Sequence, residues 1–372
     1  MSVSRSHHVP TRPPERVERA DGSPSARMPH TRRRPCGLRS PLGTIRVGAG
    51  TRRVALLLAV LFGASACAQP TSGAASAEAD VPTVERTIAL TIDDLPLGGR
   101  QGDLAHQQRV TRDLLRQIAE AGVPAIGFVN EGKLDVPGER AEREALLQAW
   151  VDAGHDLGNH TRDHPSLFDT PLAAFQEQVR QGDLVTNRLL AARGDSARYF
   201  RHPYLNAGPD LETKRAFEAW LPTLGYTVAP VTHDNSEWLY AFAYDNAAQS
   251  GDAALQARIA DAYLAYMDTT AAYFEALGRD LFGREMAHVL LVHANALNAA
   301  HLGDLIAVFR RRGYRFVTLD EALDDPAYQS EDAYAGRAGM SWLQRWAITR
   351  RVPFESEPLV DPWVEDVAYP DP

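Results

Sequence analysis

The sequence of 372 residues has only two cysteines, Cys36 and Cys67, and no apolar run of the roughly 18–20 residues that span a bilayer. It also lacks a G-x-G-x-x-G motif and a P-loop, so nothing in it supports nucleotide binding. The few cysteines exclude a disulfide scaffold. The composition, 44% hydrophobic and 23% charged, is that of a globular protein and excludes a collagen-like repeat or a chain disordered throughout.

Charge is unevenly distributed along the chain. The net charge of −9 combines +9 in residues 1–66, which hold 12 arginines and no lysine, with −18 in the remainder. An acidic body repels nucleic acid, so we expect no nucleic-acid partner. Residues 1–50, rich in Arg, Pro, Ser and Gly, are predicted to form a disordered basic head.

Residues 51–68 have the pattern of a signal peptide, since two arginines precede a nine-residue apolar run and small residues follow it. Ala64-Ser65-Ala66-Cys67 resembles a bacterial lipobox, in which Cys67 would carry the lipid. We therefore predict a periplasmic or cell-envelope lipoprotein that contacts the membrane only through Cys67. A secreted soluble protein is the alternative. A signal peptide normally begins with a short basic region, so the long head suggests a translation start further downstream.

The remaining chain divides into a linker at 69–85, a catalytic domain at 86–340 and a surface tail at 341–372. Strands are predicted at 88–92, 125–129, 155–159, 199–200, 226–232, 289–292 and 315–319. Helices are predicted at 103–120, 141–153, 170–192, 211–221, 255–277 and 302–312. Strands that alternate with helices indicate parallel pairing and an α/β fold, and about seven strands favour a β/α barrel.

Ionisable residues follow five of the predicted strands. They are, in chain order, Asp93 and Asp94, His160 and His164, Arg201 with His202, Asp234, and His293. The carboxyl ends of barrel strands form the active face, so we expect these residues to converge. Each has an ordinary alternative when taken alone. The paired Asp could cap a helix, Arg201 and Asp234 could form a surface pair, and His293 could be a core histidine.

Together these residue types fit one reaction. Two imidazoles and one carboxylate form a three-ligand site with an open position for water, the pattern of catalytic zinc. A metal bound there lowers the pKa of that water and polarises a carbonyl. The second carboxylate can then take a proton, and a histidine on the opposite wall can protonate a leaving nitrogen. The set predicts metal-dependent amide hydrolysis, with zinc, cobalt and nickel all compatible with these ligands.

Five ordered motifs resemble those of the polysaccharide deacetylases, the NodB-homology enzymes of carbohydrate esterase family 4. They are Thr91-Ile92-Asp93-Asp94, His160-Thr161-Arg162-Asp163-His164, Arg201-His202-Pro203-Tyr204, Asp234-Asn235-Ser236-Glu237-Trp238 and Leu291-Val292-His293. The resemblance covers about residues 86–320 and implies a distorted (β/α)7 barrel. It implies a hydrolase of carbon–nitrogen bonds other than peptide bonds. The enzyme would remove acetyl groups from a glycan or sugar derivative, and N-acetyl groups are the expected target.

The resemblance also implies a role for each site residue. Asp93 would be the general base, tuned by Arg201, which Asp234 would hold in place. His293 would be the general acid. A divalent ion, usually zinc, would be bound by Asp94, His160 and His164. The substrate would be bound by the backbone N–H of Tyr204 and by the side chains of Trp238 and Leu291.

The chain departs from the family pattern around the cleft. Leu95 and Leu205 stand where the family usually has glycine, and would bring side chains close to the cleft. Glu237 replaces an Asp, and the stretch from Trp238 to Val289 is unusually long. Two alternatives therefore stay open: a hydrolase of a small non-sugar amide or imide on the same scaffold, and a non-catalytic glycan-binding envelope lipoprotein.

Overall fold

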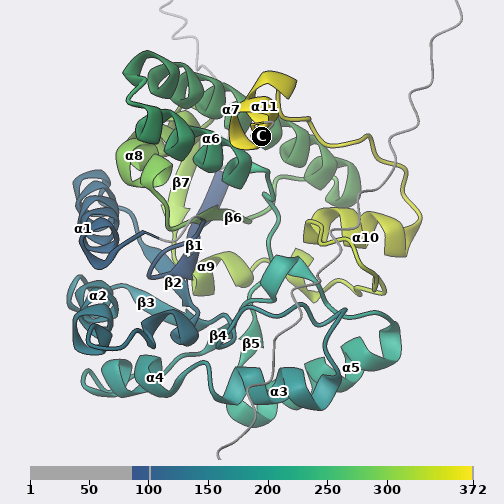
Figure 1. Ribbon diagram of the computed structural model, residues 1–372. Coiled ribbons are helices and arrows are strands. Elements are labelled where there is room, and N and C mark those ends of the chain that lie inside the picture. Colours follow the sequence, from purple (N-terminus) through teal and green to yellow (C-terminus); the bar gives the residue numbers. More distant parts are fainter. Residues whose placement is uncertain (1–85, 100–101, 371–372) are drawn as a thin grey trace, which may run out of the picture. The chain divides into compact units, whose positions relative to one another are not determined.

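The computed structural model describes residues 86–99 and 102–370, which contain a sheet of seven parallel strands (Figure 1). The strands are β1 (Arg86–Leu95), β2 (Ala125–Val129), β3 (Asp156–Asn159), β4 (Tyr199–Phe200), β5 (Thr227–Val228), β6 (His288–His293) and β7 (Tyr314–Val317). Their order is β5-β4-β3-β2-β1-β6, and β7 pairs with the first residues of β1. The predicted strands and their parallel pairing are confirmed, although β5 is shorter than the predicted 226–232.

The sheet curls until its two ends meet. The N–H groups of Thr232 and His233, which follow β5, both donate to the Val289 carbonyl of β6, at 3.1 and 2.9 Å. His233 also pairs with Leu290 in parallel register. The result is the distorted β/α barrel that the sequence predicts, and the carboxyl ends of its strands lie on one face.

Helices cover the outside of the sheet (Figure 1). They are α1 (Leu104–Ala121), α2 (Arg140–Asp152), α3 (Leu172–Arg180), α4 (Leu184–Ala191), α5 (Leu211–Trp220), α6 (Glu237–Ser250), α7 (Ala253–Phe282), α8 (Ala296–Arg311), α9 (Leu319–Leu323), α10 (Trp342–Arg350) and α11 (Pro362–Ala368). Short 3-10 turns are η1 (Glu131–Leu134), η2 (Pro203–Leu205), η3 (Leu221–Leu224) and η4 (Pro326–Gln329). Helices α6 and α7 form the long stretch after Trp238, and α6 is a helix that the sequence pattern did not predict.

Local sequence sets the ends and the buried face of α1. Asp103 caps the first turn by accepting a hydrogen bond from the His106 N–H at 2.7 Å. Gly122 ends the helix in the left-handed conformation, with a φ of 61°. The buried apolar side chains recur every four residues, at Val110, Leu114 and Ile118. The helix predicted from these residues is confirmed.

The single helix predicted at 170–192 is wrong, because the structure has two helices, α3 and α4, with a break between them. The break contains Gly182, which lies against the loop that follows β3. A Cβ atom at Gly182 would lie 2.7 Å from the carbonyl carbon of Thr161. The close approach of these two segments ends α3, and the periodicity of the sequence does not report it.

The surface tail predicted at 341–372 is also wrong, because both of its helices pack on the barrel. Helix α10 buries Trp342, Leu343 and Trp346 in one cluster with Leu205, which lies in the loop after β4. Helix α11 contributes two buried side chains to the main core. The apolar residues of α10 recur at helical spacing, and their burial outweighs the polar and proline-rich composition around them.

Three further predictions lie outside the described residues and stay predictions. They concern the basic head at 1–50, the signal peptide and lipobox at 51–68, and the linker at 69–85. Among residues 86–99 and 102–370, no helix combines the length and the apolar character that a bilayer crossing requires.

Candidate active site

A cavity of about 650 Å³ lies at the carboxyl ends of the strands and gathers most of the predicted site residues. Its lining includes Asp93, Asp94, His160, His164, Tyr204, Asp234, Trp238, Leu291 and His293. The remaining predicted residue, Arg201, is fully buried behind this lining and contacts Asp93. The expectation that these side chains converge, although they follow five different strands, is therefore met.

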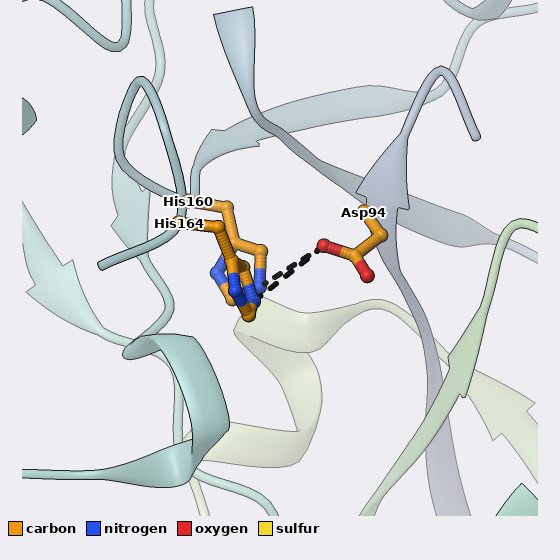
Figure 2. A group of neighbouring side chains, drawn as sticks. All are labelled: Asp94, His160 and His164. Atoms are coloured by element: carbon orange, nitrogen blue, oxygen red, sulfur yellow. Dashed lines mark ion pairs between the residues drawn. The ribbon is translucent and has the colours of Figure 1, made fainter. Parts of the chain in front are cut away.

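Asp94, His160 and His164 form a compact cluster, and both imidazoles face the carboxylate (Figure 2). Asp94 Oδ1 lies 3.6 Å from His164 Nε2 and 3.8 Å from His160 Nε2. Atoms bound tetrahedrally at about 2.1 Å from one ion lie about 3.4 Å from one another. The spacing of these three groups therefore suits a single divalent ion.

The protonation states in this cluster also suit a metal. His160 Nδ1 lies 2.8 Å from the Arg201 carbonyl and donates to it, which leaves Nε2 with a lone pair toward the cluster. Burial lowers the pKa of both His160 and His164, so both imidazoles are neutral at pH 7. The His164 N–H donates to Thr161 Oγ1 at 3.1 Å, which holds the loop between the two histidines.

Asp94 has the features expected of a ligand. Its Oδ1 atom is buried and faces three nitrogen atoms, those of the Lys133 ammonium and of the two imidazoles. Burial alone would raise the pKa of Asp94, but Lys133, whose Nζ lies 3.2 Å from Oδ1, and the nearby histidines hold it well below its usual value. Asp94 and His164 have positive φ angles of 73° and 59°, a strain that is typical of functional positions. The described residues thus fit a bound divalent ion.

Asp93 is held by Arg201 at the end of β1. Arg201 Nη1 donates to both carboxylate oxygens, at 3.3 and 3.2 Å, and Nη2 donates to Thr91 Oγ1 at 3.0 Å. Burial raises the pKa of Asp93 to about 6, against the opposing effect of the Arg201 charge. A carboxylate that is ionised at neutral pH but still basic can accept a proton.

Asp234 does not hold Arg201 directly, contrary to the prediction. The third guanidinium contact goes from Arg201 Nε to the Ala229 carbonyl at 2.9 Å. In the described part of the chain no hydrogen bond joins Asp234 to Arg201, and the Asp234 carboxylate instead accepts the Asn235 N–H at 2.8 Å. Asp234 therefore acts on Arg201 only through its charge.

Glu237 is a site residue to which the sequence analysis gave no role. It is fully buried, and its Oε2 atom lies 2.8 Å from His293 Nδ1. Its Oε1 atom accepts hydrogen bonds from the side-chain amides of Asn295 and Asn298. Burial opposes the charge on His293, but the hydrogen bond and charge of Glu237 raise the pKa of His293 to about 9. The signal in the sequence was an acidic residue directly before Trp238.

Other walls of the cavity differ from the expectation. Leu205 lines the cavity, but Leu95 is buried in the core beside Gly127, so its side chain does not reach the cleft. The C-terminal region supplies two wall residues that were not predicted, Gly339 and Glu357. Burial and the nearby Asp234 charge raise the pKa of Glu357 to about 7.

A family model for polysaccharide deacetylases matches residues 80–220. This part of the chain is similar to a polysaccharide deacetylase domain. The matched residues include Arg201 and the cluster of Asp94, His160 and His164. They end before Glu237 and His293. The geometry of those two residues is thus an observation independent of the match.

The relatives of this domain are deacetylases. A chitooligosaccharide deacetylase of Rhizobium leguminosarum bv. phaseoli is 32% identical over 130 residues, which cover 34% of this chain and 48% of the relative. A peptidoglycan-N-acetylglucosamine deacetylase of Bacillus cereus is 26% identical over 158 residues, 42% of this chain and 48% of the relative. The chain thus spans about half the length of these curated relatives. The solved chitin deacetylase of Colletotrichum lindemuthianum is 24% identical, with a TM-score of 0.43 over 65% of this chain and 89% of that one.

Proposed function

We propose that this protein is a metal-dependent hydrolase that removes acetyl groups from a glycan or a smaller sugar derivative. N-acetyl groups are the expected target. One observation carries the proposal: a three-ligand cluster, a carboxylate paired with arginine and a histidine paired with glutamate meet at one cavity. The matched relatives, which are deacetylases of chitooligosaccharides and peptidoglycan, support an acetylated carbohydrate as the substrate class.

The first half of the reaction is the attack on the acetyl carbonyl. A divalent ion, for which zinc is the expected metal, would be held by Asp94, His160 and His164. It would supply Lewis acidity and lower the pKa of water. Asp93, with a pKa of about 6, is ionised at neutral pH and accepts the proton of the attacking water. Its pairing with Arg201 keeps the carboxylate in one orientation.

The second half is the departure of the amine. His293, with a pKa of about 9, is protonated at neutral pH and donates to the nitrogen as the carbon–nitrogen bond breaks, which releases acetate and a free amine. The backbone N–H of Tyr204 donates to the developing oxyanion. Trp238 and Leu291 line the same cavity and surround the acetyl methyl group.

Removal of metal should abolish acetate release and leave the fold intact. Lys133 already lies 3.2 Å from the Asp94 carboxylate and balances its charge, so we expect the metal-free protein to melt cooperatively. The test is exhaustive chelation followed by addition of Zn²⁺, Co²⁺ or Ni²⁺, with acetate release and circular dichroism recorded at each stage. Full activity after chelation, with less than about 0.1 ion per chain left, would refute the proposal.

The substrate class is tested by assaying chitooligosaccharides, peptidoglycan fragments and small imides side by side. Release of acetate and a free amine from either glycan supports the proposal. Turnover of imides alone would favour the amide or imide hydrolase, an alternative that rests on Leu205 at the cavity, since Leu95 is buried in the core. Glycan binding without metal and without turnover would favour the non-catalytic lipoprotein.

Replacing Glu237 by Gln should move the alkaline limb of the pH–rate profile toward lower pH. His293 must be protonated to act as an acid, so the rate falls as pH rises through its pKa of about 9. Glu237 favours the protonated form, and its loss should lower that limb by about 1–3 pH units. The measurement is kcat/KM from pH 6 to 10, with the exposed Glu120→Gln as control. An unchanged limb would contradict the assigned acid.

A further inference from the structure

The loop after β4 holds two residues in a conformation that side chains seldom adopt. Tyr204 has φ 56° and ψ 18°, and Leu205 has φ 50°, both in the left-handed region. Glycine would adopt this conformation without strain, whereas the leucine side chain at this position makes it unfavourable. Something outside the loop must therefore stabilise it in this chain.

Residues 332–347, which we call the C-terminal clamp, contact this loop directly. Asn206, the next loop residue, donates from Nδ2 to the Gly336 and Arg337 carbonyls at 3.0 and 2.9 Å. Arg345 is fully buried and donates from Nη2 to the Leu205 carbonyl. The Leu205 side chain packs in one cluster with four residues of α10, Trp342, Leu343, Trp346 and Ala347.

Gly339 is where the clamp comes closest to the loop. A Cβ atom at Gly339 would overlap the carbonyl oxygen of Tyr204, so the backbone of the clamp fits only with glycine here. Gly339 also lines the cavity, beside Tyr204 and Leu205. The clamp therefore contacts the two peptide groups that follow Tyr204, at the carbonyls of Tyr204 and Leu205, and so restrains the conformation of Tyr204 from its carbonyl side.

The Tyr204 N–H has no acceptor among the described residues, and Tyr204 lines the cavity. The next two N–H groups, of Leu205 and Asn206, donate to the His202 and Pro203 carbonyls at 3.1 and 3.0 Å. A preorganised donor of this kind stabilises an oxyanion only when its direction is held, because reorientation during the reaction removes the advantage.

We infer that the C-terminal clamp is part of the catalytic apparatus, with Gly339 and Arg345 as positioning residues that aim the Tyr204 N–H at the reacting carbonyl oxygen. The inference rests on the proposed function and extends it beyond the five motifs, since the clamp follows the last of them. It also gives the C-terminal region a role in the reaction rather than only in stability.

The test is Gly339→Ala, which should displace the Tyr204 peptide. We expect kcat to fall by about 10–100-fold, within the range that loss of one oxyanion donor can cause, with little change in KM. Metal content is measured on the same samples, because the Tyr204 and His164 rings lie 4.5 Å apart, and a fall in kcat with about one ion per chain still bound separates the oxyanion donor from the metal. A matched control is Gly278→Ala in α7, where a Cβ makes only ordinary contacts, 3.4 Å to the His288 ring.

A second readout separates positioning from stability. The affinity for a tetrahedral phosphonamidate analogue of the N-acetylated sugar should fall in parallel with kcat, whereas the affinity for acetate should not. If Gly339→Ala does not fold, the same measurements on Arg345→Lys test the inference. Lysine keeps a positive charge toward Asp332 but cannot reproduce the contact with Leu205. A wild-type kcat in the deciding variant overturns the inference alone. A wild-type protein without deacetylase activity overturns the proposed function and the inference with it.

Discussion

Replacing Asp93 by asparagine should lower kcat for acetate release by about 10²–10⁴-fold, the range that a positioned general base contributes. An amide cannot take a proton at neutral pH, but its oxygen can still accept a hydrogen bond from Arg201 Nη1, which lies 3.2–3.3 Å from the carboxylate. KM should change little, since the proton transfer belongs to the transition state. Steady-state kinetics on the best glycan, with metal content determined on the same samples, measure both.

Stability must be followed in the same experiment. Arg201 is fully buried, and loss of a partner from a buried ion pair can cost about 3–5 kcal/mol, which would lower the melting temperature. Asp152→Asn, at an exposed position of α2, controls for the substitution itself. A folded Asp93→Asn protein with one bound ion and wild-type turnover would show that the proton goes elsewhere. If the folded Asp93→Asn protein instead contains no metal, Asp93 would be one of the metal ligands.

The parts of the fold that could be predicted depend on residues close together in the sequence. Asp103 and Gly122 bound α1 through contacts three or four residues away, and short apolar runs mark the strands. The convergence of the site follows from the same information, because strand ends in a parallel barrel share one face. The Asp93–Arg201 pair was implied by the resemblance to the deacetylases, since the two adjacent carboxylates alone indicated only a metal or an arginine.

The parts that could not be predicted depend on contacts between distant residues. Glu237 is held by Asn295 and Asn298, 58 and 61 residues away, and nothing near Glu237 in the sequence indicates them. Arg345 reaches Leu205 across 140 residues, in a stretch whose prolines and charges suggested a surface tail. Composition indicates only the average environment of a segment. A segment of polar composition can still pack on the core when a few of its large side chains are buried.

His164→Ala should remove the metal and, with it, acetate release. His164 offers one of the three ligand atoms, and loss of an outer-shell partner alone costs 10–100-fold in affinity, so loss of a ligand should cost at least about 100-fold. The ring is partly exposed, with 22% of its side chain accessible, so its removal leaves a smaller void than loss of the buried His160. Metal content after gel filtration and Co²⁺ titration give the stoichiometry and the affinity.

The control is His301→Ala on α8, where the imidazole pairs with Asp304 at 3.1 Å, away from the cavity lining. Its metal affinity and turnover should equal those of the wild type, which separates the loss of a ligand from the loss of a histidine.

Neutral imidazoles bind metal and imidazolium does not, so affinity in the wild type should fall as acid protonates His160 and His164. Burial keeps both pKa values below the usual one, which places that fall at a lower pH than for exposed histidines. An His164→Ala protein that retains a full equivalent of tightly bound metal would mean that the ion, and the water it activates, lie elsewhere than beside Asp94.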